Sequence, residues 1–197
     1  MNLSAQQIID VMSVKGYKVF ESDNKNFNIN LIGIRTNQNR PNEFDDWMTV
    51  MWNYNMRWNL LIFKITTDPG LYFLENVMGN ALGTAIMKEG RYSGLWQIGT
   101  HKGYKALSQK ANVTVIRDFD RDGNLDFTSG REETGMFGIN CHRANPSRQS
   151  IKVDNWSAGC QVFADPNDFN IFLSICEHAA KLWGNSFTYT LLHERDF

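Results

Sequence analysis

The feature of this sequence that most constrains its fold is a succession of short apolar runs, each bounded by glycine, proline or other turn-forming residues. Runs of roughly four to eight apolar or alternating residues between such breaks are typical of β-strands. Many of them in one chain indicate a sheet or a barrel. The expected strands are residues 27–34, 47–52, 57–66, 95–98, 104–107, 113–117, 135–141, 159–163 and 187–192. Asn53, Tyr54 and Asn55 separate two of these runs at a spacing that suits a β-hairpin.

Two segments carry the signals of helix ends. Ser4 is a suitable N-cap for a short amphipathic helix, which Gly16 would end. Residues 165–166, Asp-Pro, open a segment with apolar residues at helical spacing that ends at Gly184. Residues 71–89 contain too many glycines for one long helix, and their pattern favours no single element. The sequence therefore predicts an α+β fold with a β-rich mixed sheet or sandwich, an N-terminal helix and one long C-terminal helix.

Length and charge limit the function classes. With 197 residues, 42% of them hydrophobic and 13% aromatic, the chain can bury one core without metals or disulfides. Its 20 basic and 21 acidic residues leave a formal net charge of -1, so we expect no nucleic-acid partner. No stretch approaches the roughly 18 apolar residues of a membrane span, so we expect no membrane-spanning segment. The N-terminus lacks the pattern of a secretory signal, so we expect a protein made in the cytoplasm. The oligomeric state stays open.

The three cysteines lack the spacing of a metal site or of a disulfide framework. On a strand, the side chain of Cys141 should point away from that of His142, and Cys176 falls on the apolar face of the last helix. We expect both to be packing residues. Cys160 follows a glycine at the start of a predicted strand. It is the cysteine whose sequence context suggests a catalytic role.

Most of the candidate catalytic residues lie in residues 137–163. There, an apolar run ends near His142, and a polar loop leads from it to Cys160. A cysteine attacks carbonyl groups as the thiolate, and a neighbouring imidazole can accept its proton. Gly159 permits the close backbone approach that a tight turn needs. Main-chain N–H groups at such a turn can stabilise an oxyanion. The segment therefore predicts a cysteine nucleophile with a histidine base, which requires no cofactor for catalysis.

This segment resembles the catalytic motif of the L,D-transpeptidases, which is a histidine, a loop, then Ser or Thr, His, Gly and Cys. Here His142 is followed by fourteen residues and then by Ser157, Ala158, Gly159 and Cys160. The resemblance implies a fold of the L,D-transpeptidase type, with residues 46–197 as the catalytic domain and residues 1–45 as a helix and strand packed on it. It also implies that a peptidoglycan stem peptide acylates Cys160 and that the main chain near Ser157 orients the imidazole.

The chain departs from the motif at three positions. Ala158 replaces the usual histidine, Arg143 stands where a glycine is common, and Gln161 lies where an arginine usually contacts substrate. Arg143, Arg148 or Lys152 could bind a substrate carboxylate instead, because cationic side chains grip such groups. The predicted substrate contacts are Arg143, Arg148, Trp156, Gln161 and His101. His101 sits in a polar turn, and an exposed turn histidine without a site role is its alternative.

Residues 117–126 form an acidic loop with oxygen-bearing side chains at alternate positions around a glycine. This resembles the first half of a calcium loop of the EF-hand type, although Ser129 stands where the final glutamate would be. The candidate ligands of a structural calcium ion are Asp118, Asp120, Asp122, Asn124 and Asp126. The alternative is a hairpin turn whose acids are solvated.

The sequence thus favours cysteine-dependent acyl transfer or hydrolysis on peptidoglycan peptides. Resolution of the acyl-enzyme by an amine would give a cross-link, and resolution by water would give a carboxypeptidase or endopeptidase. One alternative is a non-catalytic structural module of a virion, or one that binds the cell wall, and another is a cysteine peptidase that acts on protein. Without a secretory signal, we expect the protein to reach the wall within a virion or through lysis.

Overall fold

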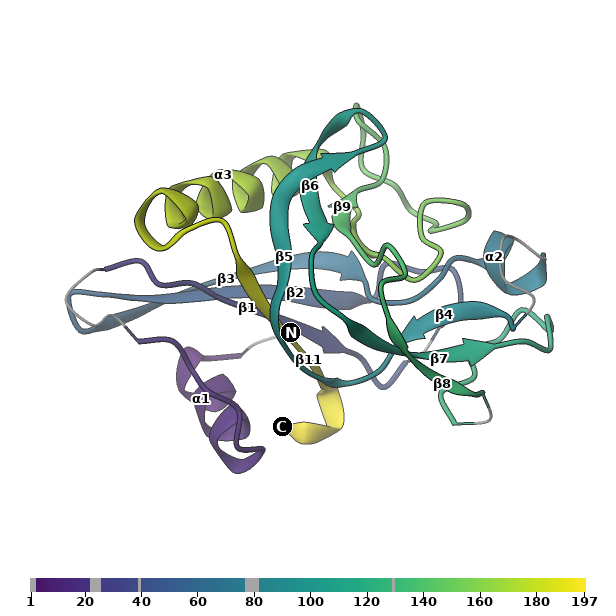
Figure 1. Cartoon of the computed structure of the whole chain (residues 1–197), viewed down its shortest axis with the longest axis horizontal. Helices are drawn as coiled ribbons and strands as arrows, with labels where there is room; N and C mark the ends of the chain where they lie inside the picture. Colours follow the sequence, from purple (N-terminus) through teal and green to yellow (C-terminus); the bar gives the residue numbers. More distant parts are fainter. Residues whose placement is uncertain (1–2, 22–25, 39, 77–81, 129) are drawn as a thin grey trace.

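Strands dominate the structure, as the succession of short runs predicted (Figure 1). The computed structural model describes residues 3–21, 26–38, 40–76, 82–128 and 130–197. Its helices are α1 (Ala5–Val14), α2 (Leu71–Glu75), α3 (Pro166–Trp183) and the 3-10 helix η1 (Glu194–Asp196). Its strands are β1 (Asn30–Arg35), β2 (Asp46–Tyr54), β3 (Arg57–Thr66), β4 (Thr84–Met87), β5 (Gly90–His101), β6 (Tyr104–Gln109), β7 (Val113–Asp118), β8 (Glu132–Gly135), β9 (Cys141–Arg143), β10 (Gln161–Phe163) and β11 (Phe187–His193).

The main sheet closes into a barrel in the strand order β1-β11-β5-β6-β9-β10-β3-β2, and β4, β7 and β8 form a second sheet. The β1–β11 and β9–β10 pairs are parallel, whereas the other barrel neighbours are antiparallel. The fold is therefore α+β with a mixed sheet, as predicted. It is a closed barrel rather than a sandwich, because strands from both chain ends complete the ring.

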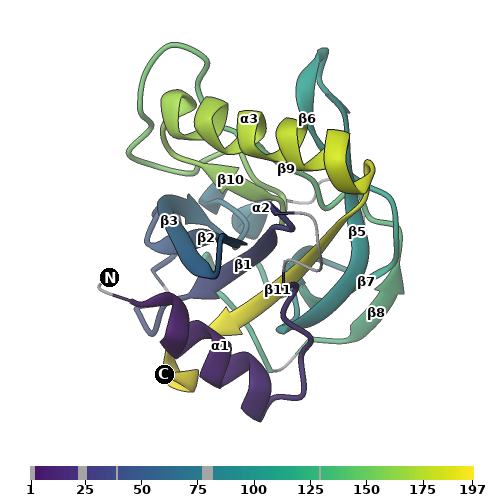
Figure 2. The same cartoon turned by 90° about the vertical axis from the view of Figure 1, so that its left-hand side faces the viewer.

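The core fills the barrel and continues under α3, which lies across it and contacts β9 and β10 (Figure 2). Trp96 and Tyr189 pack against each other inside, with ring centroids 4.4 Å apart and ring planes tilted by 35°. Gly33 makes room for this pair, because a Cβ atom there would lie 1.8 Å from the Tyr189 hydroxyl. This position requires a glycine because the Tyr189 side chain approaches the backbone of β1 so closely.

Local signals explain the two helices that the sequence predicted. Ser4 caps α1 in a capping box with Gln7, and the helix buries Ile8 and Met12 against β1 on the outside of the barrel. The Asp165 side chain accepts a hydrogen bond from the N–H of residue 167, so it caps α3, which ends before Gly184 at a φ of 92°. Both predictions are confirmed.

Several predicted boundaries were wrong. The 27–34 run pairs only from residue 30, and the 159–163 run only from residue 161. The hairpin between β2 and β3 turns at Asn55 and Met56, whose φ angles of 49° and 62° are left-handed. The unassigned 71–89 segment contains α2 and β4, and residues 77–81 lie outside the described part of the chain.

The predicted strand 135–141 does not exist as one element, since β8 ends at Gly135 and β9 begins at Cys141. Between them, the Gln109 side chain accepts hydrogen bonds from the N–H groups of Phe137 and Ile139. A side-chain amide therefore takes the place of a neighbouring strand, and Gly138 bends the chain at a φ of 75°.

The N-terminal segment and the rest of the chain share the barrel, because β1 lies between β11 and β2. The division into residues 1–45 and 46–197 stays a prediction. Among the described residues, no helix is long and apolar enough to cross a membrane.

Candidate active site

His142 lies on β9, and Cys160 directly precedes β10, the parallel neighbour of β9 in the barrel. His142 pairs in register with Val162, and Cys141 pairs with Gln161. Cys141 and Gln161 are fully buried toward the barrel interior, where they meet core residues. Because side chains alternate along a strand, His142 and Cys160 lie on the opposite, outer face. The two segments that carry His142 and Cys160 are therefore neighbours in the barrel, with His142 level with Val162.

The protonation of the His142 ring follows from its hydrogen bonds. Its Nδ1 lies 2.8 Å from the carbonyl oxygen of Arg143, which can only accept, so Nδ1 carries the hydrogen and Nε2 is the basic nitrogen. The Tyr104 hydroxyl donates to the same carbonyl at 3.1 Å. The resemblance implied orientation by the main chain near Ser157, and the Arg143 carbonyl does this instead. Burial and then the neighbouring His101 lower the pKa of His142 to about 3.

The Cys160 thiol rests among main-chain groups. Its Sγ lies 3.4 Å from the Gly138 carbonyl oxygen, to which it donates, and 3.4 Å from the Asn140 N–H, from which it accepts. Burial raises the pKa of Cys160 to about 11, against the opposing effect of the Asn140 N–H. Among the residues that the structure describes, no hydrogen bond joins Cys160 to His142. The resting thiol is therefore protonated at neutral pH.

The turn that precedes Cys160 is held by Ser157. Its hydroxyl accepts from the Gly159 N–H at 3.1 Å and donates to the Cys160 carbonyl at 2.9 Å, while its own carbonyl accepts from the Gly70 N–H. Gly159 has a φ of 113°, and a Cβ atom there would lie 2.2 Å from the Ala85 carbonyl oxygen. The close backbone approach expected of this glycine is confirmed, and Ser157 fixes the turn around it.

Gln161 supports the site from inside the barrel. It accepts a hydrogen bond of 2.7 Å from the Tyr189 hydroxyl, and its amide nitrogen donates to the Thr67 carbonyl. It is fully buried. The structure thus places this predicted substrate contact away from the face that carries Cys160.

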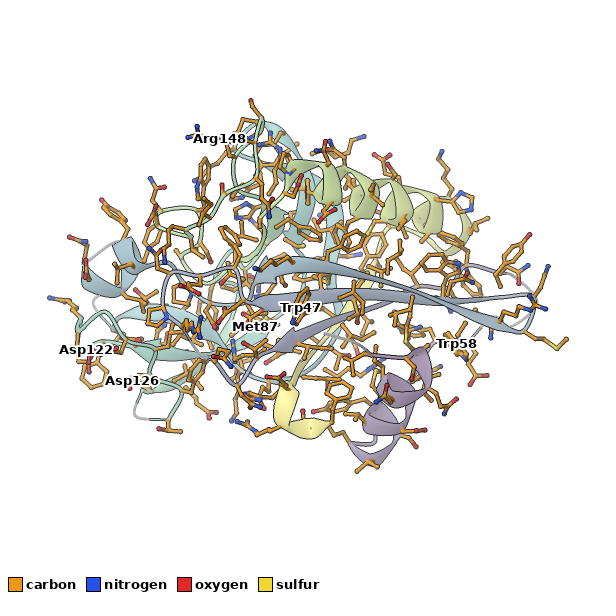
Figure 3. The ribbon with its side chains drawn as sticks, turned by 180° about the vertical axis from the view of Figure 1, so that it is seen from behind. Trp47, Trp58, Met87, Asp122, Asp126 and Arg148 are labelled. Atoms are coloured by element: carbon orange, nitrogen blue, oxygen red, sulfur yellow. The ribbon has the colours of Figure 1, made fainter. Side chains whose placement is uncertain are left out.

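The other predicted substrate contacts flank the loop between β9 and β10. The Arg143 guanidinium lies 4.2 Å from the centroid of the Tyr104 ring. Arg148 is exposed on the loop and lies at the edge of the molecule in Figure 3. Trp156 is half-buried and packs on the apolar cluster that includes Cys160. Trp156 and, through Tyr104, Arg143 are thus linked to the site, whereas Arg148 lies on the exposed loop.

His101 lies much closer to the site than its polar sequence context indicated. It ends β5 at the tip of the β5–β6 hairpin, and its ring stacks on His142 with centroids 4.0 Å apart and planes 12° apart. Its Nδ1 is 3.1 Å from the Asn140 amide nitrogen. Burial and then the charge of Lys102 lower the pKa of His101. The structure joins these two histidines, which are 41 positions apart in the sequence.

Sequence reasoning missed Gln109, which is 9% exposed. Besides the two N–H groups of the 135–139 segment, its side chain binds the carbonyls of Ala111 and Gly135. It thereby holds the segment that presents the main-chain groups of Gly138 and Asn140 to the Cys160 thiol. A glutamine at the end of an apolar run gives no sequence signal for such a role.

The acidic loop lies at one end of the molecule, where Figure 3 shows Asp122 and Asp126. Asp118 accepts a hydrogen bond from the Asp126 N–H, and Asp122 accepts two from Asn124. Burial raises the pKa of Asp118 to about 6, and the charge of Asp120 acts in the same direction. These bonds are those of tight polar turns.

A calcium site at this loop stays a prediction. Within the described ranges, no group of three or more His, Cys, Asp or Glu residues is arranged to hold a metal ion. Ser129, at the position of the missing glutamate, lies outside those ranges. Asn124, the remaining candidate ligand, is exposed beside Asp122.

The function of the site has to be inferred from its geometry, because comparison with known proteins found no match. That geometry is a buried thiol before β10, a histidine of defined tautomer on the neighbouring strand β9, a turn held by Ser157, and a second histidine stacked on the first. No protein-family model, no curated protein and no solved structure matches the chain.

Proposed function

We propose that this protein is a cysteine-dependent acyltransferase or hydrolase that acts on peptidoglycan stem peptides and is similar to the L,D-transpeptidases. The observation that carries the proposal is the parallel β9–β10 pair. It brings His142 and Cys160 to one face of the barrel, and the Arg143 carbonyl leaves Nε2 of His142 unprotonated. A histidine in this tautomer is the form that can accept a thiol proton.

The proposed reaction begins with rotation of the Cys160 side chain away from the Gly138 carbonyl and toward His142. The thiol proton passes to Nε2 of His142, and the thiolate sulfur forms a bond to the carbonyl carbon of the scissile peptide. Collapse of the tetrahedral intermediate breaks the carbon–nitrogen bond, and the leaving amine takes the proton from His142. An acceptor amine or water then attacks the thioester carbonyl and gives a proton to Nε2 of His142. The carbon–sulfur bond breaks, and this proton returns to the sulfur of Cys160 as the acyl product leaves.

A hollow of about 320 Å³ near the C-terminal end of β10 is the candidate for peptide binding. Phe44 and Ala164 line it and pack in the same apolar cluster as Cys160. Lys152 also lines it and forms an ion pair of 3.2 Å with Glu43. Charges of both signs suit a stem peptide, which carries amino and carboxylate groups. The exposed Arg148 is a further candidate for the carboxylate.

A non-catalytic module that binds the cell wall is the second candidate, and the resting thiol favours it. Cys160 is only 9% exposed and His142 only 2%. A protonated thiol with main-chain partners is also what a structural cysteine would show. Such a module would hold glycan or peptide without turnover.

The test is incubation with tetrapeptide-bearing muropeptides followed by mass spectrometry of tryptic peptides. We expect an acyl adduct on the peptide that contains Cys160. Cys160→Ala and His142→Ala should each reduce turnover by roughly a thousandfold or more, and the double variant should lose little further, because both residues serve one step. Cys176→Ala is the matched control at a buried thiol on α3, and it should retain turnover.

Two results would separate the candidates. Unmodified Cys160 together with unchanged muropeptides from several wall chemistries would refute the enzyme. Sacculus binding that survives in Cys160→Ala would then support the module. Cleavage of casein but not of muropeptides would instead indicate a peptidase that acts on protein.

A further inference from the structure

The tip of the β5–β6 hairpin holds the His142 ring from two sides. His101 and Tyr104 flank the tip, where Lys102 and Gly103 adopt φ angles of 46° and 84°. His101 covers one face of the His142 ring at a centroid distance of 4.0 Å. The Tyr104 hydroxyl lies 3.3 Å from Nδ1 at the ring edge. The tight turn thus brings both side chains onto a residue of another strand.

Asn140 determines which nitrogen of His101 carries hydrogen. The main-chain N–H of Gln109 donates to the Asn140 side-chain oxygen at 2.8 Å, which fixes the orientation of the amide. The amide nitrogen is therefore the atom 3.1 Å from Nδ1 of His101, and it can only donate. Nδ1 of His101 must accept, so its hydrogen is on Nε2 and the ring is neutral.

A neutral His101 suits a neighbour that must receive a proton. If His101 were charged, its Nδ1–H would point at the donor group of Asn140, and its charge would face the stacked His142 ring. The nearby Lys102 and Arg143 already add positive charge. The stacked ring constrains the plane of His142, while the Arg143 carbonyl fixes the rotation of the ring within that plane.

We propose that His101 is a positioning residue for His142, held neutral by Asn140, so that Nε2 of His142 keeps a fixed direction for proton transfer. This inference rests on the proposed function for its kinetic consequence. Asn140 also links the two parts of the site, because its main-chain N–H donates to Cys160 Sγ. One residue thereby ties the stacked histidines to the thiol.

The experiment compares His101→Ala, His101→Phe and the control His178→Ala, which alters an exposed histidine on α3. Loss of the stacked face in His101→Ala should lower kcat by about tenfold to a hundredfold with little change in KM, because misplaced groups slow the reaction. His101→Phe keeps a flat ring and should restore most of kcat. In ¹⁵N NMR spectra of the unaltered protein near neutral pH, His142 should be protonated on Nδ1 and His101 on Nε2.

The NMR spectra test the inference independently of turnover. If muropeptides are not turned over, only the proposed function is refuted. In His101→Ala, the His142 nitrogens should move toward a mixture of tautomers, and in His101→Phe they should stay as in the parent. A folded His101→Ala with parental kcat and a parental His142 spectrum would overturn the inference. If His101→Ala does not fold, His101→Phe decides, since a mixed His142 tautomer there would refute positioning by the stack. An Nδ1-protonated or charged His101 in the parent would likewise refute the role of Asn140.

Discussion

Replacement of Gln109 by methionine should destabilise the fold while nearly preserving side-chain length and volume. The Gln109 side chain makes hydrogen bonds of 2.8 and 3.0 Å to the carbonyls of Ala111 and Gly135, and of 3.1 and 2.8 Å from the N–H groups of Phe137 and Ile139. At about 1 kcal/mol each, their loss would cost about 4 kcal/mol. Water can replace the partners that are half-buried, but not readily the buried Ile139 N–H, so we expect a loss of about 2–3 kcal/mol in the free energy of unfolding.

Urea denaturation followed by circular dichroism measures this loss, and Gln149→Met is the matched control on an exposed loop. The control should change stability by less than about 0.5 kcal/mol. Because the segment that Gln109 holds also presents Gly138 and Asn140 to the thiol, iodoacetamide should modify Cys160 faster in Gln109→Met. Equal stabilities of the two variants, with an unchanged rate of Cys160 alkylation, would refute this reasoning.

Two further predictions concern protons and calcium. His142 titrates near pH 6.5 when unfolded but has a folded pKa of about 3, so stability should fall as the pH drops through this window, by about 2 kcal/mol between pH 7 and pH 5. Urea titrations should show a flatter dependence in His142→Gln, and an unchanged slope would contradict the assignment. If the acidic loop binds calcium, a hundredfold excess over Kd should add about 2.7 kcal/mol and raise the melting temperature, whereas Asp120→Asn should lose this response. Identical melting curves of the parent in calcium and in chelator would dismiss the site.

Local chemistry let the sequence determine many elements of the fold. Ser4 and Asp165 mark the starts of α1 and α3 because a capping side chain acts on N–H groups within three residues of it. Alternation along the chain likewise identified most strands, since side-chain direction repeats every two residues. Such signals lie within a few positions of one another and need no knowledge of the rest of the chain.

The neighbourhood of His142 and Cys160 was also predictable, because a motif and two apolar runs surround them. The sequence could indicate that the two segments lie close together, and the β9–β10 pair makes them neighbours in the barrel. It could not indicate the resting partners of the thiol. Those are main-chain groups of residues 138 and 140, which lie outside any strand and are held there by Gln109.

Tertiary structure alone decided the closure of the barrel and the surroundings of His142. The β1–β11 pair joins Leu31 to Tyr189, and no local pattern specifies a partner so distant in the chain. His101 reaches His142 because β6 connects the hairpin tip to β9. Pairing between strands depends on the free energy of the whole core, whereas a cap or an alternating run depends only on its immediate neighbours. The sequence by itself therefore determined the elements and the candidate residues, and the folded barrel determined which of them touch.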